Sequence, residues 1–462
     1  MESGFRLTLA ALCAVSLVQC RPASPRTNLL LIVTDTLRAD ALACYGGSAH
    51  TPNICGLADR GVLFEVAYAN APWTPPSAAS IFTGNYPTAY ANLSSGPSYA
   101  PSFWVSDEEV LLGEALRARG YDVGLGSMSV LVRNANVLQG FEPLPQPPDP
   151  IDAALSGVAK TGEYLRNHDG TPFFLLEWFM DPHAPYEASG VLEQLEVDTS
   201  RLSRPLVFYT TLGHQTEPRM REHAPEMSDY ELEVLRRLYF AEVERIDEKV
   251  GNLLRVLDDA GLRQSTYVVF TSDHGEGFGE HGTFLHGVSF HDELTRVPWI
   301  MAGPEIAPGT RVEMPVSLVD LMPTLRDLLA VDCLNDPQGR SLRPLLRGGA
   351  GAETGEARHA HYLASPDKLI RGMDAVVDQN YKLIAMLNGR VALYDRSEDP
   401  GELHDLAGER PDVVSRMRAE LGRIRGEKDG RRGKNFAFRT EADKLEVHER
   451  TLQGLRALGY VE

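Results

Sequence analysis

Four short apolar runs along the chain have the length and composition of buried β-strands. They cover residues 28–34, 173–179, 266–271 and 297–301. A strand covered on both faces needs apolar side chains at successive positions, whereas a strand with one wet face alternates between apolar and polar residues. The run at 28–34 in particular predicts a central strand with helices on both sides.

Helix signals lie between these runs. A Thr-Pro pair opens residues 51–61, which end at a glycine. A serine followed three residues later by glutamate, the capping-box spacing, occurs within residues 106–119 and again in a long amphipathic stretch at 228–261. Strands that alternate with helices predict an α/β fold, with a large, doubly wound, mostly parallel sheet flanked by helices.

The pattern changes after residue 348. A Gly/Ala-rich linker covers residues 348–355. Beyond it we expect two strands of a small sheet and two helices, at residues 375–384, 390–394, 411–425 and 441–458. The chain is too long for one ordinary core, so we expect a large domain of residues 28–348 and a smaller C-terminal α+β domain of residues 356–462.

The first twenty residues have the pattern of an export signal. A positive charge precedes an apolar run at residues 7–18, which is too short to cross a bilayer as a stable helix. The run leads to Cys20 in a stretch that resembles a bacterial lipoprotein cleavage site. We therefore expect residues 1–20 to be a signal peptide, with export to the periplasm or cell envelope and Cys20 as a candidate lipid anchor. The alternative is a buried N-terminal helix that Pro22 would end.

The net charge of the chain limits the kinds of molecule that it can bind. The chain carries 64 acidic and 45 basic side chains, a formal net charge of −19, which argues against nucleic-acid binding. Any site for an anion must then be locally positive, and a bound metal ion supplies that charge directly. The cysteines show no paired spacing, so we predict neither a disulfide framework nor a zinc ribbon. They are Cys13, Cys20, Cys44, Cys55 and Cys333.

Candidate metal ligands follow two of the predicted strands. Asp35 comes directly after the run at 28–34, and Asp273 and His274 stand in the same position after the run at 266–271. In an open α/β sheet, ligands bind beyond the carboxyl ends of the strands. Two carboxylates and an imidazole can share one divalent cation there. Taken singly, each of these residues is more often a turn former or a cap.

Thr74 stands at the start of a predicted short helix that runs to about residue 83. Pro75 suits the first helical position, which makes Thr74 the expected N-cap, and capping alone would explain a threonine here. The alternative is catalytic. Helix N-termini favour anions, and a metal ion on the hydroxyl would lower its pKa and prepare it to attack sulfur or phosphorus.

At the level of motifs the sequence resembles the sulfatase family, within the alkaline-phosphatase-like superfamily. The matching stretches, in the family's order, are VTDTLRADALACYG (33–46), TPNICGLADRGVLF (51–64), APWTPPSAASIFTGNYPT (71–88), DPHAPY (181–186), YVVFTSDHGEGFGEHG (267–282) and LTRVPWIMAGP (294–304). YKLI (381–384), LYDRSEDPGELHDLA (393–407) and the ending ALGYVE (457–462) resemble the family's C-terminal region. The resemblance implies that residues 28–348 are a sulfatase-like catalytic domain.

The resemblance also implies roles for single residues. The two aspartates and the histidine after the strands would hold a divalent metal ion, together with Thr74 at the nucleophile position. His183 would contact the substrate, and His286 lies near where the family places a lysine or histidine on the ester and leaving group. Glu276 and His281 are close in sequence, as partners of these groups or as loop caps.

The departures from the family are chemically specific. Sulfatases carry Cys or Ser in a C/S-x-P-S-R box that is converted to formylglycine, whereas residues 74–78 read TPPSA, with Ala78 in place of the arginine. The paired aspartates are here Asp35 and Thr36, and residues 126–132 lack the family's lysine and histidine. The remaining oxygen and nitrogen ligands suit Mn²⁺ or Zn²⁺ as well as the Ca²⁺ usual in sulfatases.

Three functions remain open from the sequence. The leading one is a metal-dependent hydrolase of sulfuric or phosphoric esters with Thr74 as nucleophile, acting on a sulfated or phosphorylated glycan, lipid or small molecule. A threonine nucleophile resembles the phosphodiesterase and phosphoethanolamine-transferase branches, which favours phosphorus. The alternatives are a phosphoethanolamine-type transferase that acts on an envelope lipid or glycan, and an inactive protein that binds an anionic glycan.

Overall fold

The computed structural model describes residues 26–89, 105–128, 132, 135–145, 158–186, 195–210, 227–331, 336–348, 361–364, 373–386 and 388–429. The predicted signal peptide with Cys20 and the predicted helix at 441–458 lie outside these ranges. None of the described helices is long and apolar enough to cross a membrane.

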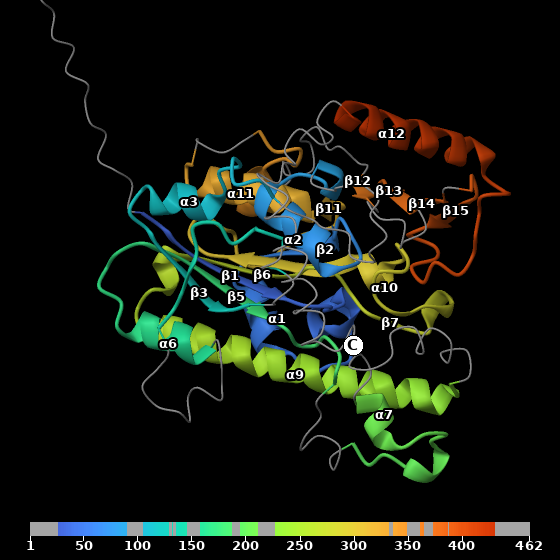
Figure 1. Cartoon of the computed structure of the whole chain (residues 1–462), viewed down its shortest axis with the longest axis horizontal. Helices are drawn as coiled ribbons and strands as arrows, with labels where there is room; N and C mark the ends of the chain where they lie inside the picture. The colour runs from blue at the N-terminus through green and yellow to red at the C-terminus, as the bar shows by residue number, and fades with distance from the viewer. Residues whose placement is uncertain are drawn as a thin grey trace, which may run out of the picture.

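A nine-stranded sheet forms the centre of the molecule (Figure 1). Its strands are β1 (Asn28–Thr34), β2 (Val62–Tyr68), β3 (Asp122–Ser127), β4 (Glu142–Pro143), β5 (Phe173–Phe179), β6 (Thr266–Ser272), β9 (Arg296–Ala302), β10 (Thr310–Val312) and β11 (Val316–Ser317). The order is β10-β2-β9-β6-β1-β5-β3-β4, with β11 beside β2. Only β9 runs antiparallel to its neighbours, β2 and β6. The predicted α/β fold with a mostly parallel sheet is confirmed.

Helices cover both faces of this sheet (Figure 1). On one face lie α2 (Thr74–Thr83), α3 (Leu112–Arg117) and α11 (Leu321–Leu328), and on the other α1 (Pro52–Asp59), α6 (Val158–Arg166) and α9 (Asp229–Asp259). Two short helices, α7 (Leu206–Thr210) and α10 (Asp292–Thr295), lie outside these layers. Such two-sided cover explains the continuous apolar runs, because successive side chains of a strand enter opposite layers.

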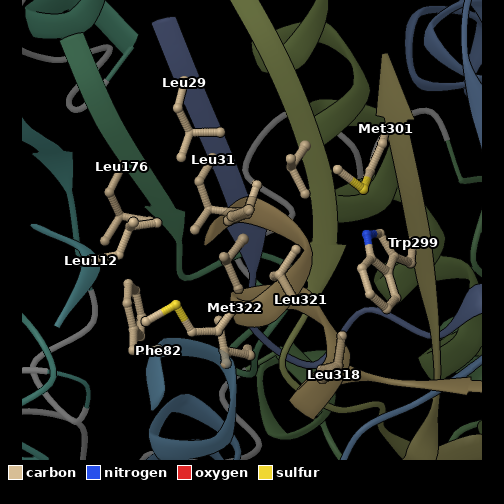
Figure 2. Packing of buried hydrophobic residues seen from close by; sticks show 14 of the residues in the cluster. Leu29, Leu31, Phe82, Leu112, Leu176, Trp299, Met301, Leu318, Leu321 and Met322 are labelled. Carbon is tan, nitrogen blue, oxygen red and sulfur yellow. The ribbon is translucent and has the colours of Figure 1, made fainter. Parts of the chain in front are cut away.

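Strand β1 shows this division most clearly. Leu29 and Leu31 pack into the layer of α2 and α11, whereas Leu30 and Ile32 pack into the layer of α1 and α9. Figure 2 shows the first of these layers, in which Met322 of α11 lies beside Phe82 of α2, below Leu31 of β1. All seven residues of β1 are buried. The strand is therefore fixed from both sides up to the residue that precedes Asp35.

One of the two predicted capping boxes is confirmed. At the start of α9, Ser228 Oγ accepts a hydrogen bond from Glu231 N and Glu231 Oε2 accepts one from Ser228 N. The box predicted at Ser106 is wrong: its hydroxyl closes a turn by accepting from Glu108 N, and α3 starts only at Leu112. The backbone N–H of Leu111 is satisfied by Glu114 Oε2, so the helix can start there without Ser106.

A small antiparallel sheet follows in the C-terminal part, as predicted. It consists of β12 (His361–Ala364), β13 (Met373–Val377), β14 (Tyr381–Met386) and β15 (Val391–Asp395), and α12 (Pro411–Asp429) packs against it. The stretch 375–384, which we predicted as a single strand, contains a turn between β13 and β14. The Asp378 carboxylate accepts from Asn380 N and Tyr381 N there, so the chain reverses within three residues.

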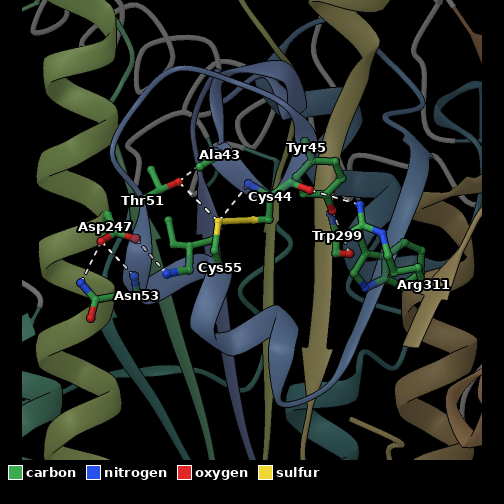
Figure 3. The surroundings of a disulfide bond; sticks show 10 residues. Ala43, Cys44, Tyr45, Thr51, Asn53, Cys55, Asp247, Trp299 and Arg311 are labelled. Atoms are coloured by element: carbon green, nitrogen blue, oxygen red, sulfur yellow. Dashed lines mark hydrogen bonds between the residues drawn. A yellow bond between two sulfur atoms is a disulfide. The ribbon is translucent and has the colours of Figure 1, made fainter. Parts of the chain in front are cut away.

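Cys44 and Cys55 form a disulfide (Figure 3). The prediction of no disulfide framework is therefore wrong for this pair, whose Cα atoms are 5.4 Å apart across 11 positions of sequence. The loop between them folds back, so two cysteines with no recognisable spacing meet. Thr51 is the N-cap residue of α1, as predicted, but its hydroxyl makes no bond to the helix; it accepts from Ala43 N at 3.0 Å and holds the same loop.

Candidate active site

The candidate metal ligands meet because β1 and β6 are neighbouring parallel strands. Thr34 pairs with Ser272 at the ends of the two strands, so Asp35 and Asp273 leave the sheet side by side. Backbone hydrogen bonds continue one step past the strands, with Asp273 N donating to Thr34 O at 3.2 Å. The carboxyl edge of the sheet thus brings together residues that are 238 positions apart, as the sequence predicted.

Asp35, Asp273 and His274 form one compact, fully buried group. Their ligand atoms lie within 4.8 Å of one another. His274 Nδ1 is 2.9 Å from Gly275 O and donates to it, which leaves the lone pair of Nε2 facing the carboxylates. Nε2 is 3.4 Å from Asp273 Oδ2 and 3.7 Å from Asp35 Oδ1. Three electron-pair donors therefore converge on one volume.

The electrostatics of this group call for a cation. Burial raises the pKa of Asp35 to about 6 and raises the pKa of Asp273 well above its usual range, while it lowers the pKa of His274. Among the described residues, Asp273 Oδ2 has no hydrogen-bond partner. Buried carboxylates without a counter-charge are costly, and a divalent cation would accept all these lone pairs. The residues present therefore fit a divalent ion with mixed oxygen and nitrogen ligands.

Thr74 completes the group from the other side. Its hydroxyl lies 3.2 Å from His274 Nε2 and 3.4 Å from Asp35 Oδ1. The prediction that Thr74 is the N-cap is wrong by one position: Trp73 is the N-cap and Thr74 is the first residue of α2. The hydroxyl consequently does not cap the helix. It faces the Asp–His group, close to the helix N-terminus, as the catalytic alternative requires.

Two further imidazoles adjoin the group, both predicted from the sequence. The ring centroid of His286 is 4.7 Å from that of His274 and 5.0 Å from that of His183. His286 Nδ1 is 3.0 Å from Glu276 Oε1, and His183 Nδ1 contacts Ala184 O. In both rings Nδ1 is thereby oriented, so Nε2 is the nitrogen that can meet a substrate.

Two supporting residues were not singled out from the sequence. Ser77 Oγ donates to Asp273 O at 2.5 Å and ties the first turn of α2 to the end of β6. Tyr186 Oη donates to Glu276 Oε2 at 3.4 Å, the second oxygen of the carboxylate that holds His286. Both lie inside motifs that the sequence matched. The available signal was a polar side chain within a largely apolar motif. Their hydrogen-bond partners could not be predicted, because these come from distant segments of the chain.

His281 belongs to a different cluster. It forms a second group with His291 and Glu293 whose donor atoms are close enough to share an ion. Its ring is parallel to that of His291, at 5° with centroids 3.7 Å apart, so the in-plane lone pairs of the two rings run side by side and do not converge. His281 Nδ1 is 3.0 Å from Glu293 Oε1 and Nε2 is 3.1 Å from Glu402 O. The bond to Glu402 holds the loop against the C-terminal part.

Comparisons with known proteins agree with this architecture. The sulfatase family model matches residues 27–331, and the model described as N-sulphoglucosamine sulphohydrolase, C-terminal, matches residues 279–427. The chain therefore belongs to the sulfatase family, within the alkaline-phosphatase-like superfamily, and it is a sulfatase-family hydrolase.

Three relatives illustrate the breadth of the match. Arylsulfatase K of Xenopus laevis is 27% identical over 453 residues, covering 87% of this chain and 83% of the relative. The solved structure of a 2-O GAG sulfatase is 26% identical with a TM-score of 0.70, covering 89% of this chain and 95% of the other. A phosphonate monoester hydrolase of Agrobacterium radiobacter shares the fold at 22% identity, with a TM-score of 0.67 and cover of 87% and 96%.

Proposed function

We propose that the protein is a metal-dependent hydrolase of anionic sulfuric or phosphoric esters in which Thr74 is the nucleophile. The observation that carries the proposal is the position of the Thr74 hydroxyl, 3.2 Å from His274 Nε2 and 3.4 Å from Asp35 Oδ1. Because this hydroxyl does not cap its helix, capping no longer explains the threonine.

Asp35, Thr74, Asp273 and His274 would hold one divalent ion. When bound, the ion would offset negative charge on the non-bridging oxygens of the ester and lower the pKa of the Thr74 hydroxyl. Ca²⁺ follows from the family resemblance, and Mn²⁺ or Zn²⁺ follows from the donor set.

The chain's own residues supply the remaining steps. Thr74 Oγ gives its proton to the Asp35 carboxylate, 3.4 Å away, and forms a bond to phosphorus or sulfur while the bond to the ester oxygen breaks. The imidazolium of His286, held at Nδ1 by Glu276, gives its Nε2 proton to the leaving oxygen, and His183 orients the ester. A water molecule then attacks the Thr74 ester and gives a proton to the imidazole. The Asp35 carboxyl returns its proton to the Thr74 oxygen as the bond to phosphorus or sulfur breaks, which restores the hydroxyl and releases the acid.

The nucleophile favours phosphorus over sulfur. Threonine lacks the oxidation chemistry that yields formylglycine, so the aldehyde hydrate by which sulfatases release sulfate cannot form at Thr74. Phosphodiesters and phosphonate monoesters need no such route, and the same fold serves a phosphonate monoester hydrolase. Sulfate esters of glycans are the second candidate, because the similar solved structure is named a 2-O GAG sulfatase.

The other two functions predicted from the sequence have weaker support. Transfer to an envelope lipid or glycan would use the same Thr74 intermediate, with an alcohol in place of the water. An inactive glycan-binding protein would gain nothing from a buried group of two carboxylates without a cation, since such a group destabilises the fold. The intact site therefore favours catalysis.

Substitution of Thr74 tests the nucleophile. Thr74→Ala should lower turnover about a thousandfold or more, as when an activated nucleophile is removed from other enzymes, and Thr74→Ser should keep part of it. Thr83→Ala is the matched control, because Thr83 is a buried threonine of the same helix that donates to Ala79 O. Each protein is assayed, with divalent ions added, on an aryl sulfate, an aryl phosphodiester and an aryl phosphonate.

The outcomes separate the candidates. The proposal expects the phosphodiester or the phosphonate to be the faster substrate, and Thr74 to appear unmodified by peptide mass spectrometry. Near-normal turnover in Thr74→Ala would instead point to direct attack by water. A clear preference for the aryl sulfate would place the protein with sulfatases that act without formylglycine.

We also propose that the protein is exported to the periplasm or cell envelope, with Cys20 as the candidate lipid anchor. The export pattern of residues 1–20 supports this, and so does the Cys44–Cys55 disulfide, because disulfides persist mainly in oxidising compartments. Fractionation of cells that express the full chain decides the compartment, and Cys20→Ala decides the anchor.

A further inference from the structure

The turn that follows β1 contains a strained residue beside the candidate metal ligands. Thr36, the residue after Asp35, has a φ of 63°, in the left-handed region that a β-branched residue rarely adopts. It is fully buried, and within the described part of the chain its hydroxyl has no hydrogen-bond partner. The Thr36 side chain therefore does not compensate for the strain, and other groups must hold the turn.

The hydroxyl of Tyr239 provides that support. It donates to Thr36 O at 2.9 Å and accepts from Arg38 N at 2.9 Å, so one oxygen bridges the turn from α9. Tyr239 is fully buried, and its ring packs edge-on against Phe278 at 4.9 Å. A rigid aromatic side chain on a 31-residue helix thus fixes both ends of the strained peptide segment.

The Thr36 turn also holds the candidate metal ligand Asp273. Thr36 N donates to Asp273 Oδ1 at 3.2 Å, and Leu37 N donates to Ser272 Oγ at 2.8 Å. These two bonds join the segment after β1 to the end of β6. If Thr36 relaxed to negative φ, its N–H would turn away from Asp273, and Asp35 on the preceding peptide would be reoriented.

We propose that Tyr239 is a positioning residue for the metal site: it holds the strained Thr36 turn so that Asp35 and Asp273 keep the geometry that binds a divalent cation. The inference rests on the metal site of the proposed function. Groups that orient metal ligands typically contribute 10–100-fold to metal affinity, although they never touch the ion.

Tyr239→Phe tests this, with Tyr45→Phe as the matched control. Tyr45 is likewise a tyrosine whose hydroxyl bonds one backbone N–H and one carbonyl, those of Trp299, within β9. Calorimetric titration of the metal-free full chain with Ca²⁺, with Mn²⁺ and with Zn²⁺ measures affinity, and thermal unfolding measures stability. We expect both variants to lower Tm, but only Tyr239→Phe to weaken metal binding by about 10–100-fold. Tyr45→Phe should stay within about threefold of the wild type.

A rescue experiment separates strain at the turn from general loosening. Thr36→Gly removes the penalty for positive φ, so a turn with glycine needs less support. In the Tyr239→Phe background, Thr36→Gly should restore most of the lost affinity, while alone it should leave affinity within about threefold of the wild type. A purely structural role of Tyr239 gives no reason for such a rescue.

Each outcome bears on a different claim. A wild type that binds none of the three ions would overturn the proposed metal site and this inference together. Tight binding by the wild type with equal affinities of Tyr239→Phe and Tyr45→Phe would overturn the inference alone. Weak binding by Tyr239→Phe without rescue by Thr36→Gly would overturn the claim that the strained turn is what Tyr239 holds.

Discussion

The two oxygens of the Asp273 carboxylate are in different situations. Oδ1 accepts hydrogen bonds from Thr36 N and from His274 N, whereas Oδ2 has no partner in the part of the chain described by the structure. Asp273→Asn keeps the shape and removes the charge. We expect this variant to lose the stabilisation that a divalent ion gives the wild type, about 4 kcal/mol at a thousand times Kd.

The same variant should behave oppositely without metal. In EDTA at neutral pH, Asp273→Asn should unfold at a higher temperature than the wild type, because one of two neighbouring buried carboxylates is gone. Thermal unfolding with and without metal, together with elemental analysis, measures both effects. Full metal occupancy in the variant, or a wild type that EDTA does not destabilise, would contradict the assignment of Asp273 as a ligand.

A second buried carboxylate gives a pH prediction. Burial raises the pKa of Glu177 on β5 to about 7, although the hydroxyls of Ser127 and Thr161 donate to it. The folded protein therefore keeps a proton that the unfolded chain releases above its ordinary pKa of about 4.5. The free energy of unfolding should fall as pH rises from about 4.5 to 7 and stay low above that window.

Glu177→Gln should remove this dependence. The amide keeps the shape and cannot ionise, so we expect the variant to exceed the wild type in stability at pH 8 by at most about 3 kcal/mol. Glu163→Gln, at a half-exposed position of α6, is the matched control. Denaturant unfolding at pH 5 and pH 8 gives the comparison. A gain at pH 5 as large as at pH 8 would refute ionisation as the cause.

At the scale of elements, the disulfide fixes the loop between Asp35 and α1. The bridge closes a loop of about 11 residues and should contribute about 2–3 kcal/mol through restriction of the unfolded chain. Reduction of the wild type should therefore lower Tm to that of the Cys44→Ser, Cys55→Ser double variant. A reductant should leave the double variant unchanged. Equal melting of the oxidised and reduced wild type would show that the bridge adds no stability.

Elements were predictable from the sequence where the signal is local. The apolar runs predicted the observed bounds of β1 and β5. A strand buried on both faces is apolar at successive positions, and this pattern can be recognised without knowing which elements pack against the strand. The Cys44–Cys55 bridge was missed for the opposite reason, since only the folded loop brings the two sulfur atoms together. The Asp35–Asp273 pairing was predictable because parallel strands end at one edge.

The contacts around that pair were less predictable. The approach of His286 to His183 depends on two loops that extend from different elements, so the sequence could place these residues together only through the family resemblance. The support from Tyr239 was hidden for another reason. Along α9 its position fits the apolar stripe of an amphipathic helix, and only its hydroxyl distinguishes it from ordinary core residues.

At the scale of the whole molecule, a buried lysine joins the two parts of the chain. Lys382 on β14 is fully buried, and its Nζ lies 2.7 Å from Asp292 Oδ1 and 2.9 Å from Glu402 Oε1. Asp292 begins α10 in the catalytic part, and Glu402 follows β15. Glu402 also accepts from Asp292 N through Oε2, and its carbonyl contacts His281. The group of Lys382, Asp292 and Glu402 thus borders the loop that leads to His286.

Removal of the Lys382 charge should therefore lower the stability of both parts. Lys382→Met removes the ammonium that both the buried Glu402 and the partly exposed Asp292 contact, and we expect a loss of about 3–5 kcal/mol. The small sheet should then unfold before the catalytic part, giving two calorimetric transitions in place of one. The matched variant adds Asp292→Asn and Glu402→Gln to Lys382→Met, which removes the uncompensated charges and should restore most of the stability and the single transition. If the triple variant stayed as unstable as Lys382→Met, the loss would come from the packing of the lysine stem. The ion pairs of Lys382 would then not be the interaction that couples the small sheet to the active-site loop.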